Sequence, residues 1–453
     1  MISLDYFNCI KDKYLINGLT ESQIFSSEKQ QEIKNAILNK SRPMMEWLDL
    51  PFQNESLVEE IQTYGKQIAK NFEHFIVLGI GGSALGTKAI KQALYSPADQ
   101  KIKVSIIDNV DSEKFLQILQ SINIEKTMFN VVTKSGSTVE ILTMFAIVLS
   151  TLKAKLGNEF YKNIVVTTEC TNALWNFSKE NKIRTFEVPK SVGGRYSVLC
   201  PVGLLPSAVM GIDLFKLLEG AKKVYLNFKN QKAGQNISFQ SALINYNYLL
   251  NGKREIIISP YSYRLELMAD FYIQLLSESL GKEKKLDATE NQLFFTPIKA
   301  VGVTFQHSLL QMFQEGCKER LFCFINLKKH NADIKVPKIG DERLDVFLPD
   351  TMVDLMKKEQ IGCAIAYKKA NLPSYEVEVE NLTEESVGAL LFYFELTTAI
   401  MAELMNVNAY NQNGVEMQKK FTKALIKTPG FENTELGTML KVKEKFNNSK
   451  TKV

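Results

Sequence analysis

The stretch HFIVLGIGGSALGTKAIKQALY, residues 74–95, decides the fold class. Its apolar beginning, residues 74–80, ends in glycines and passes directly into a segment whose apolar side chains have helical spacing. This order is typical of a β-strand, a tight turn and an α-helix. Glycines let the turn backbone pass close to a ligand, and the helix that follows offers free N–H groups and a positive dipole end to an anion.

Further apolar runs of strand length follow, and helical patterns separate them. The first group is VSIIDN (104–109), MFNVVT (128–133), NIVVTTE (163–169) and RTFEVP (184–189). The second group, after the Gly/Asn-rich stretch 227–238, is REIIISP (254–260), FTPIKAVG (295–302), RLFCFINL (320–327) and SYEVEVE (374–380). Because strands that alternate with helices form parallel sheets covered on both faces, the sequence predicts an α/β fold with two αβα sandwiches.

The two groups also predict how the chain divides. We expect a helical N-terminal segment (1–70), a first αβα domain (71–226), a second αβα domain (227–405) and a helical C-terminal segment (406–453). A chain of 453 residues is long enough for two or three domains. Hydrophobic residues make up 45% and charged residues 23%, which is ordinary globular composition and excludes fibrous repeats and wholesale disorder.

Charge and cysteine content narrow the class further. The 55 Lys and Arg against 50 Asp and Glu leave a net charge of +5, too weak a field to indicate nucleic acid or a membrane surface as a partner. The six cysteines form no C-x-x-C pair and no close cluster with histidine. We therefore expect reduced core thiols in a cytoplasmic protein, with no metal and no redox cofactor.

Two segments bear on export and membranes. Residues 1–25 carry charged side chains where the apolar core of a signal peptide would stand, so we expect no export signal. Residues 387–405 are the most apolar long stretch, but they contain Glu395 and Glu403 and repeat with helical period. They predict a buried helix and no membrane span.

The glycine loop 79–88 fits three interpretations. As a dinucleotide fingerprint, Gly79, Gly81 and Ala84 satisfy G-x-G-x-x-A and Asp108 ends the next strand, but this short pattern is common by chance. As a Walker loop it fails, because its threonine precedes the lysine instead of following it. Taken alone, the loop is best explained as a tight turn that needs glycine for its geometry.

A second polar loop, KSGSTVE (134–140), favours a phosphate ligand. It follows a strand and crowds three hydroxyls and a lysine at the start of a helix. Capping explains one hydroxyl, whereas three suit the several oxygens of a phosphate. Both loops project beyond the carboxyl ends of parallel strands, where ligands collect in open α/β sheets. The expected phosphate-binding residues are Gly82, Ser83, Lys134, Ser135, Ser137 and Thr138.

Several motifs, in this order, resemble the glucose-6-phosphate isomerases. They are GIGGS (79–83), TKSGSTVE (133–140), VGGRYSVLCPVGLLP (192–206), ESLGK (278–282), the Gln306-His307-Ser308 step and YNQNGVEMQK (410–419). The resemblance covers most of the chain. It implies two sugar-isomerase (SIS-type) αβα domains and a homodimer with its site at the subunit interface. The sequence departs from the family pattern at Lys190, Cys200 and Asn411.

The resemblance also implies the catalytic residues. Glu278 would carry the proton between C2 and C1 of the sugar, and Arg195 would stabilise the enediolate. His307, at the start of an expected helix, would protonate the ring oxygen. Lys419 would support contacts to the ring and its hydroxyls. The implied substrate-binding residues are Gln274, one turn before Glu278 on the same helix face, and Gln412.

Each of these side chains also has an ordinary structural explanation. Without the resemblance, Glu278 would be an exposed glutamate at a helix end, Arg195 a surface arginine after a glycine turn, and Lys419 a solvated lysine. Of the other histidines, His74 precedes a strand and His330 stands in a charged loop. Neither competes strongly for the role of ring-opening acid.

We therefore expect a cytoplasmic aldose–ketose isomerase that interconverts glucose 6-phosphate and fructose 6-phosphate in glycolysis and gluconeogenesis. Two alternatives remain open at this point. A non-catalytic sugar-phosphate-binding regulator of the same fold would keep both phosphate loops without needing the four catalytic side chains. An NAD-dependent dehydrogenase would use Gly79, Gly81 and Asp108.

Overall fold

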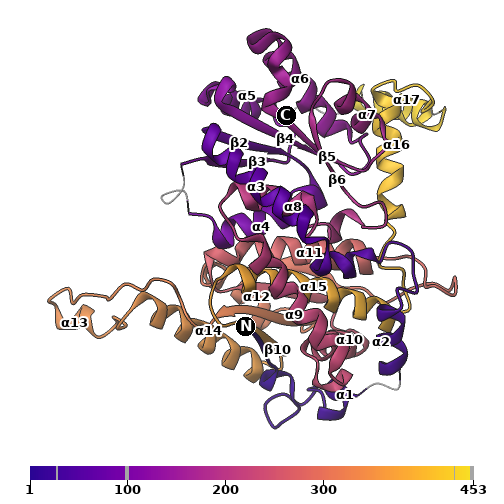
Figure 1. The fold of residues 1–453 in the computed structure, drawn as a ribbon. Helices are drawn as coiled ribbons and strands as arrows, with labels where there is room; N and C mark the ends of the chain where they lie inside the picture. Colours follow the sequence, from indigo (N-terminus) through magenta and orange to yellow (C-terminus); the bar gives the residue numbers. More distant parts are fainter. Residues whose placement is uncertain (27–28, 97–100, 433, 449–453) are drawn as a thin grey trace. The chain divides into compact units, whose positions relative to one another are not determined.

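A computed structural model describes residues 1–26, 29–96, 101–432 and 434–448. The chain forms two compact units, Met1–Tyr410 and Asn411–Val453. The larger unit contains two five-stranded sheets. A layer of helices separates these sheets in Figure 1. The predicted α/β class with two sandwiches is confirmed.

The first sheet is parallel throughout and has the order β3-β2-β4-β5-β6. Its strands are β2 (His74–Leu78), β3 (Lys103–Ile107), β4 (Thr127–Val132), β5 (Ile164–Thr168) and β6 (Arg184–Glu187). From β2 the chain goes to β3 on one side and then returns to β4 on the other. The carboxyl ends of β2 and β4 therefore form the switch point, where the direction of the connections reverses.

The second sheet has the order β1-β10-β9-β7-β8. Its strands are β1 (Ile2–Asp5), β7 (Glu255–Pro260), β8 (Thr296–Lys299), β9 (Arg320–Leu327) and β10 (Ser374–Val379). All of its pairs are parallel except β1 with β10. We expected only helices before residue 71, so β1 corrects that prediction. A short edge strand that pairs with a distant part of the chain leaves no local pattern in the sequence.

The helices of the larger unit mostly match the expected segments. Those up to the end of the first sheet are α1 (Glu21–Phe25), α2 (Gln30–Leu38), α3 (Glu55–Asn71), α4 (Leu85–Leu94), α5 (Ser112–Ser121), α6 (Val139–Leu156) and α7 (Ala173–Glu180). Those that follow are α8 (Pro201–Val209), α9 (Leu214–Asn230), α10 (Ile237–Leu250), α11 (Glu266–Leu280), α12 (Leu310–Glu315), α13 (Glu342–Asp345), α14 (Met352–Lys369) and α15 (Glu384–Leu404).

Helix α15 forms the centre of the helical layer and packs against α9, α10 and α11. By length and composition it is apolar enough to cross a membrane, but 89% of its most apolar window is buried inside the protein. The prediction of a buried helix is confirmed. Glycines allow α9 and α15 to cross closely: a Cβ on Gly220 or Gly388 would lie 1.8 Å from a backbone oxygen of the facing helix.

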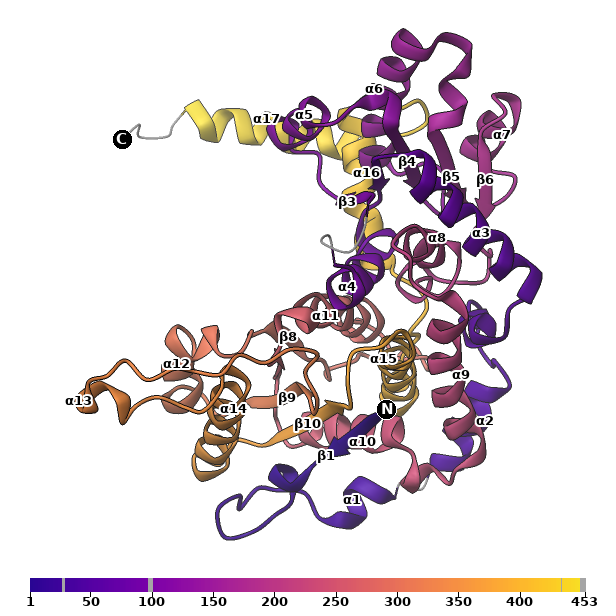
Figure 2. The same ribbon diagram turned by 60° about the vertical axis from the view of Figure 1, so that its left-hand side comes forward.

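A projection leaves the second sheet between β9 and α14. Both Figure 1 and Figure 2 show α13 at its tip, away from the sheets. Large apolar side chains stand exposed on it and on the α14 surface that follows: Ile334, Ile339, Leu344, Val346, Phe347, Met352, Ile361 and Ile365. These side chains give the projection and α14 an exposed apolar surface.

The smaller unit consists of η11 (Asn413–Val415), α16 (Glu416–Leu425) and α17 (Thr434–Asn448). The helical C-terminal segment expected from residue 406 thus begins as a separate unit at residue 411. The expected boundaries at residues 70, 226 and 405 stay predictions.

All six cysteines are free, but they do not all lie in the core. Cys9, Cys200, Cys323 and Cys363 are buried, whereas Cys317 is exposed and Cys170 is partly exposed. The expectation of six core thiols was therefore wrong for these last two. Cys317 stands in the polar turn between α12 and β9, where the neighbouring residues give it no apolar cover.

Cys200 also departs from the family pattern, in which Thr or Ser is more usual. It is the N-cap residue of α8, its backbone is extended, and its side chain makes no capping hydrogen bond. A contact with the Val202 N–H lowers the pKa of the thiol, but complete burial outweighs it and raises the pKa to about 12. A hydroxyl in this place would accept a stronger bond from the free N–H.

We expect Cys200→Ser to raise the free energy of unfolding by about 0.5–1 kcal/mol, because serine is a good N-cap residue and sulfur is a weak acceptor. Equilibrium denaturation would measure the change. Cys323→Ser is the control, because this buried thiol lies within a strand and caps no helix. A higher free energy of unfolding in both variants, or a lower one in Cys200→Ser, would contradict the capping argument.

Candidate active site

The two loops expected to bind phosphate lie at the switch point of the first sheet. The turn η3 (Gly81–Ser83) follows β2, and residues 133–138 follow β4. β2 and β4 are hydrogen-bonded neighbours in parallel register. Their carboxyl ends therefore bring both loops to the same edge of the sheet, where a ligand can contact both.

The 133–138 loop holds its hydroxyls in a tight group. Thr133 Oγ1 and Thr138 Oγ1 are 2.7 Å apart, and Ser137 Oγ donates to Ser135 Oγ at 3.2 Å. Thr138 is the N-cap residue of α6, but its side chain makes no capping hydrogen bond. Helix capping therefore does not account for these hydroxyls, which suit an anion with several oxygens.

Lys134 lies beside these hydroxyls and is tied to a departure from the family pattern. Its Nζ donates to the backbone oxygen of Lys190 at 2.7 Å. Burial lowers the pKa of Lys134, and the nearby charge of Lys190 acts in the same direction. A bound phosphate would compensate both positive charges.

The glycine loop packs directly on the turn that carries Arg195. That turn, η7 (Gly194–Tyr196), approaches η3 so closely that a Cβ on Gly82 would lie 2.3 Å from the carbonyl carbon of Gly194 and 2.7 Å from the amide nitrogen of Arg195. Both neighbours are backbone atoms, which cannot rotate away. Gly82 is therefore required by this contact.

Arg195 is buried, with only 3% of its surface exposed, so it is not a surface arginine. Its Nη1 lies 3.2 Å from Glu278 Oε2, its Nε donates to Ser279 Oγ at 2.8 Å, and its Nη2 donates to the backbone oxygen of Ala409. The guanidinium also lies 5.7 Å from the ring centroid of Tyr196. These contacts fix the position of the charge.

Glu278 lies near the end of α11 and is held from two sides. Its Oε2 pairs with Arg195, and its Oε1 accepts a hydrogen bond from Gln274 Nε2 at 2.9 Å. Gln274 Nε2 in turn would lie 3.3 Å from a Cβ on Gly81. The side chain of Glu278 is 30% exposed, so a ligand can reach the carboxylate. The structure thus brings together the glycine loop, the Arg195 turn and the Gln274–Glu278 turn of α11.

Sequence reasoning did not assign a role to Lys282, which lies in the same place. Its Nζ donates to the backbone oxygen of Glu278 at 2.6 Å. Burial and then the charge of Arg195 lower the pKa of Lys282 to about 8. Lys282 and Ser279 both stand within the ESLGK motif, so the motif itself was the available signal.

His307 does not join this group through any hydrogen bond or ion pair among the described residues. It is exposed and ends the turn η10 (Thr304–His307), while α12 begins only at Leu310. The single helix expected from Gln306 is therefore wrong. Gln306 Nε2 donates to Tyr261 Oη at 2.7 Å and to the Glu359 backbone oxygen at 3.2 Å, which ties the turn to Tyr261 and α14.

Gln412 and Lys419 belong to the smaller unit. Lys419 lies on α16, where its Nζ pairs with Glu416 Oε1 at 3.0 Å, one turn away. The implied roles of Gln412 and Lys419 stay predictions.

The observed contacts bear on the dehydrogenase alternative. Asp108, the expected ribose-binding acid, forms an ion pair with Lys88 from α4. Its carboxylate is therefore already engaged by a cation. In the described part of the chain, no group of three or more His, Cys, Asp or Glu side chains is arranged to hold a metal ion.

Comparisons with known proteins agree with the motifs. The sequence profile described as phosphoglucose isomerase matches residues 44–439. The glucose-6-phosphate isomerase of Carboxydothermus hydrogenoformans is 36% identical over 416 residues, which cover 89% of this chain and 89% of that protein. A solved structure of a hypothetical protein from Thermus thermophilus has a TM-score of 0.86 at 30% identity, with 94% of this chain and 100% of that chain covered.

A glucose-6-phosphate isomerase from Chlamydia trachomatis shares the fold. Its TM-score is 0.84 at 20% identity, and 98% of this chain and 92% of that chain are covered. The likeness therefore extends over both sheets.

We expect Gly82→Ala to reduce kcat/KM and to lower thermal stability, because the new methyl group would press on the backbone of the Arg195 turn. A displacement of about 1 Å at a reacting group costs on the order of a hundredfold in rate. The control is Gly193→Ala, whose Cβ would meet only the Tyr196 ring, at an ordinary 3.8 Å. Equal kcat/KM and equal thermal stability of the two variants would show that the close contact between Gly82 and the Arg195 turn is not required.

Lys282 predicts a dependence of stability on pH. In the unfolded chain it keeps its proton up to the ordinary pKa of 10.5, but in the folded protein only up to about 8. Between these values the unfolded state binds more protons, so the free energy of unfolding should rise with pH. Compared with Lys282→Met, the wild type should gain stability from pH 8 to pH 10.5, and not below pH 8.

Denaturant unfolding at a series of pH values would measure this gain. The control is Lys284→Met, which removes an exposed lysine from the same loop and should follow the wild type. If the difference between wild type and Lys282→Met stayed constant across the range, the ammonium of Lys282 would not be desolvated as described.

Proposed function

The chain belongs to the phosphoglucose isomerase family, and we propose that it interconverts glucose 6-phosphate and fructose 6-phosphate at the Arg195–Glu278 pair. One observation carries this assignment. The buried Arg195 lies on a turn that packs against the expected phosphate loop, and its guanidinium is 3.2 Å from the accessible carboxylate of Glu278 on α11. Proton transfer through an enediolate needs a base and a fixed positive charge in such proximity.

The phosphate group would anchor the substrate at the switch point of the first sheet. The Ser83 hydroxyl and the hydroxyls of the 133–138 loop can donate to its oxygens, and Gly82 lets the backbone approach them closely. Lys134 adds a positive charge next to them. The sugar chain then extends from this anchor toward Glu278.

Glu278 would take the proton from C2 and return it to C1. Each carboxylate oxygen has one partner, Gln274 on one side and Arg195 on the other. These bonds orient the carboxylate without covering it. A positioned base of this kind contributes about a hundred- to ten-thousand-fold in rate.

Arg195 would stabilise the negative oxygens of the enediolate. Its guanidinium stays protonated and does not compete with Glu278 as a base. Because Ser279 Oγ and the backbone oxygen of Ala409 hold the guanidinium in place, it needs little movement as charge develops on the substrate.

His307 and Lys419 would serve ring opening and the ring contacts, as the resemblance implies. His307 is exposed and makes no hydrogen bond or ion pair with any described residue, so its imidazole is available to an incoming group. We propose that His307 acts on a substrate that is bound mainly by the other subunit of a homodimer.

The exposed projection supports this homodimer. Val346 is 74% exposed and Phe347 80% exposed near the tip that carries α13. Apolar side chains in such numbers are typical of a surface covered by a partner. A second copy of the chain is the partner we propose.

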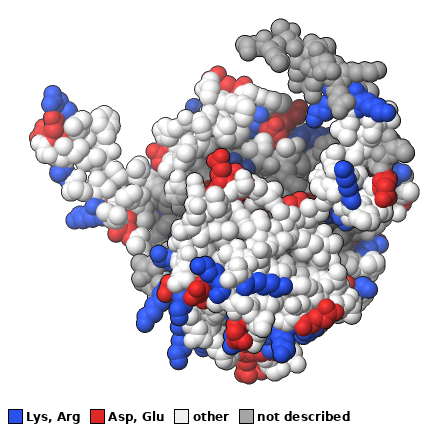
Figure 3. All heavy atoms as spheres, turned by 90° about the horizontal axis from the view of Figure 1, so that it is seen from above, with Lys and Arg blue, Asp and Glu red and all other residues white. Residues whose placement is uncertain are grey.

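The remaining expectations are also part of this proposal. Figure 3 shows a largely uncharged face on which basic and acidic residues are interspersed. Together with the net charge of only +5, this distribution supports a protein without a nucleic acid or membrane partner. Six free cysteines support a cytoplasmic location. There the isomerase would serve glycolysis and gluconeogenesis without metal or redox cofactor.

A non-catalytic regulator is not favoured. Such a protein would need the phosphate loops but no base beside a buried cation. The Gln274–Glu278–Arg195 arrangement exceeds what sugar-phosphate binding requires, since the phosphate loops alone can hold the ligand.

We expect Glu278→Gln to lower kcat at least about a hundredfold while substrate affinity changes little, because the amide keeps the size of the side chain but loses its basicity. A coupled assay and calorimetric titration would measure the two quantities. Glu283→Gln, an exposed change on the next loop, is the control. A variant Glu278→Gln with wild-type kcat would exclude this residue as the base.

The shared site predicts complementation between inactive variants. A heterodimer of Glu278→Gln and His307→Ala subunits contains one intact pair of these residues if the two come from different subunits. We expect such heterodimers to recover up to about half of the wild-type activity. Two affinity tags would verify the heterodimer, and verified heterodimers without activity would contradict a site shared in this way.

A further inference from the structure

The second sheet has a switch point of its own. β7 lies between β8 and β9, so the chain leaves β7 on one side and returns on the other, as it does around β2 in the first sheet. A cavity of about 450 Å³ begins beside it, at Tyr261 after β7 and the end of β9, and extends over β10 and β1 beneath α14. The switch point is where ligands bind in open α/β sheets, and the volume is in the range of small-molecule sites.

One wall of the cavity is acidic. Asp5 on β1 is paired in register with Glu376 on β10, and Glu378 follows two residues later, so all three side chains lie on the same face of the sheet. The Glu376 carboxylate is fixed by Asn326 Nδ2 at 2.8 Å and Gln360 Nε2 at 2.7 Å. Burial raises the pKa of Glu376, and the nearby carboxylate of Asp5 acts in the same direction.

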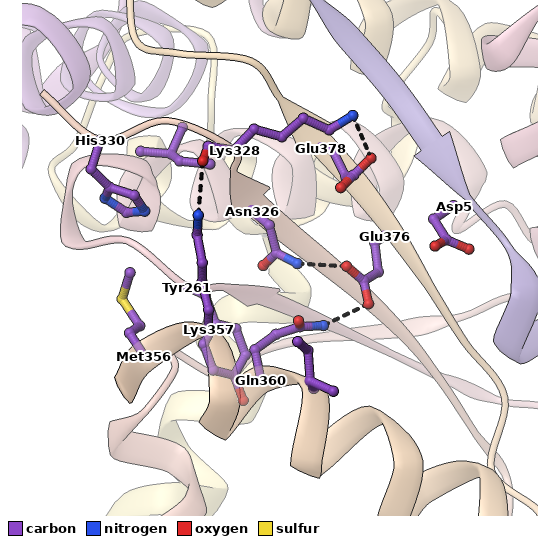
Figure 4. Close-up of a pocket in the computed structure, with 12 residues that line it drawn as sticks. Asp5, Tyr261, Asn326, Lys328, His330, Met356, Lys357, Gln360, Glu376 and Glu378 are labelled. Carbon is purple, nitrogen blue, oxygen red and sulfur yellow. Dashed lines mark hydrogen bonds and ion pairs between the residues drawn. The ribbon is translucent and has the colours of Figure 1, made fainter. Parts of the chain in front are cut away.

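The opposite wall is basic. In Figure 4, His330 and the amino group of Lys357 lie on one side of the cavity, and Asp5 and Glu376 on the other. Lys357 Nζ donates to the backbone oxygen of Lys328 at 2.9 Å. Within the described part of the chain, no carboxylate lies within ion-pair distance of it.

The charges of the cavity are only partly compensated within the protein. Lys328 Nζ pairs with Glu378 Oε2 at 2.9 Å, which neutralises these two side chains. Asp5 and Glu376 on one wall and Lys357 on the other have no ion-pair partner among the described residues. A simple anion would be attracted by Lys357 but repelled by the carboxylates, and a simple cation would be attracted by the carboxylates but repelled by Lys357. A ligand of one sign therefore suits only half of the cavity.

We propose that this cavity binds a small zwitterion, whose protonated amine faces Asp5 and Glu376 and whose phosphate or carboxylate faces Lys357 and His330. Both halves of such a ligand gain charge-assisted hydrogen bonds, and the charge of the cavity is compensated on both walls. The site is separate from the Arg195–Glu278 pair, because it lies on the second sheet and shares no lining residue with the phosphate loops.

The test uses calorimetric titration of the full-length protein with three probes. They are 2-aminoethyl phosphate, 3-aminopropanoate and ethyl phosphate, which lacks the amine. A saturating equilibrium mixture of the two sugar phosphates keeps the active site occupied. We expect one of the two zwitterions to bind at millimolar concentration or better, and ethyl phosphate at least about tenfold more weakly. The zwitterion that binds more tightly shows whether the cavity prefers a phosphate or a carboxylate as the acidic group of its ligand.

Single variants assign the binding to the cavity. Glu376→Gln and Lys357→Gln should each lower the affinity for the zwitterion at least about tenfold. Isomerase activity should stay unchanged, which also shows that the variants fold. Lys358→Gln is the matched control, because this neighbouring lysine pairs with Asp354 and does not line the cavity. Absence of zwitterion binding, equal binding of ethyl phosphate, or binding that both cavity variants leave unchanged would overturn the proposal.

Discussion

The buried guanidinium of Arg195 is the interaction on which the rest of the site depends. A buried charge is costly unless it is paired and hydrogen-bonded, and the partners of Arg195 come from several parts of the chain. Glu278 and Ser279 lie at the end of α11, and the backbone oxygen of Ala409 lies at the end of the larger unit. The same turn supports the glycine loop through Gly82. Loss of Arg195 would therefore disturb three segments at once.

The helical layer explains how these segments meet. Helix α11 begins beyond β7 of the second sheet and ends beside the loops of the first, and it packs against both α4 and α15. A carboxylate from one half of the larger unit is thereby fixed against an arginine from the other. Neither sheet alone contains both groups, so packing of the two halves completes the pair.

The sequence predicts much of the fold because most strands carry their own signal. The apolar runs between turn residues correspond to β2 to β10, and the mostly apolar composition of residues 387–405 predicts the burial of α15. β1 carries no such signal, since four residues at a sheet edge gain their stability from a distant partner. The two exposed or partly exposed thiols were missed because burial of a cysteine depends on tertiary neighbours.

The site was predictable to a lesser degree, for a related reason. The motifs single out Gln274, Glu278 and Arg195, and the structure brings these side chains into contact. Only the folded chain shows that Arg195 is buried and that Lys282 bonds the backbone of Glu278. The opposite walls of the second cavity bring together Asp5, Lys357 and Glu376 from distant segments. No local pattern connects them, so this cavity could not be predicted from the sequence.

The central claim is that Arg195 acts on the enediolate more than on the bound sugar. A phosphorylated hydroxamate of the same chain length imitates the planar, negatively charged enediolate, whereas fructose 6-phosphate represents the ground state. The dissociation constants of both ligands should be measured for the wild type and for Arg195→Lys. The account predicts that the variant loses about a hundredfold or more in affinity for the hydroxamate and less than about tenfold for fructose 6-phosphate. Equal losses for the two ligands would contradict it, because Arg195 would then contribute only to binding.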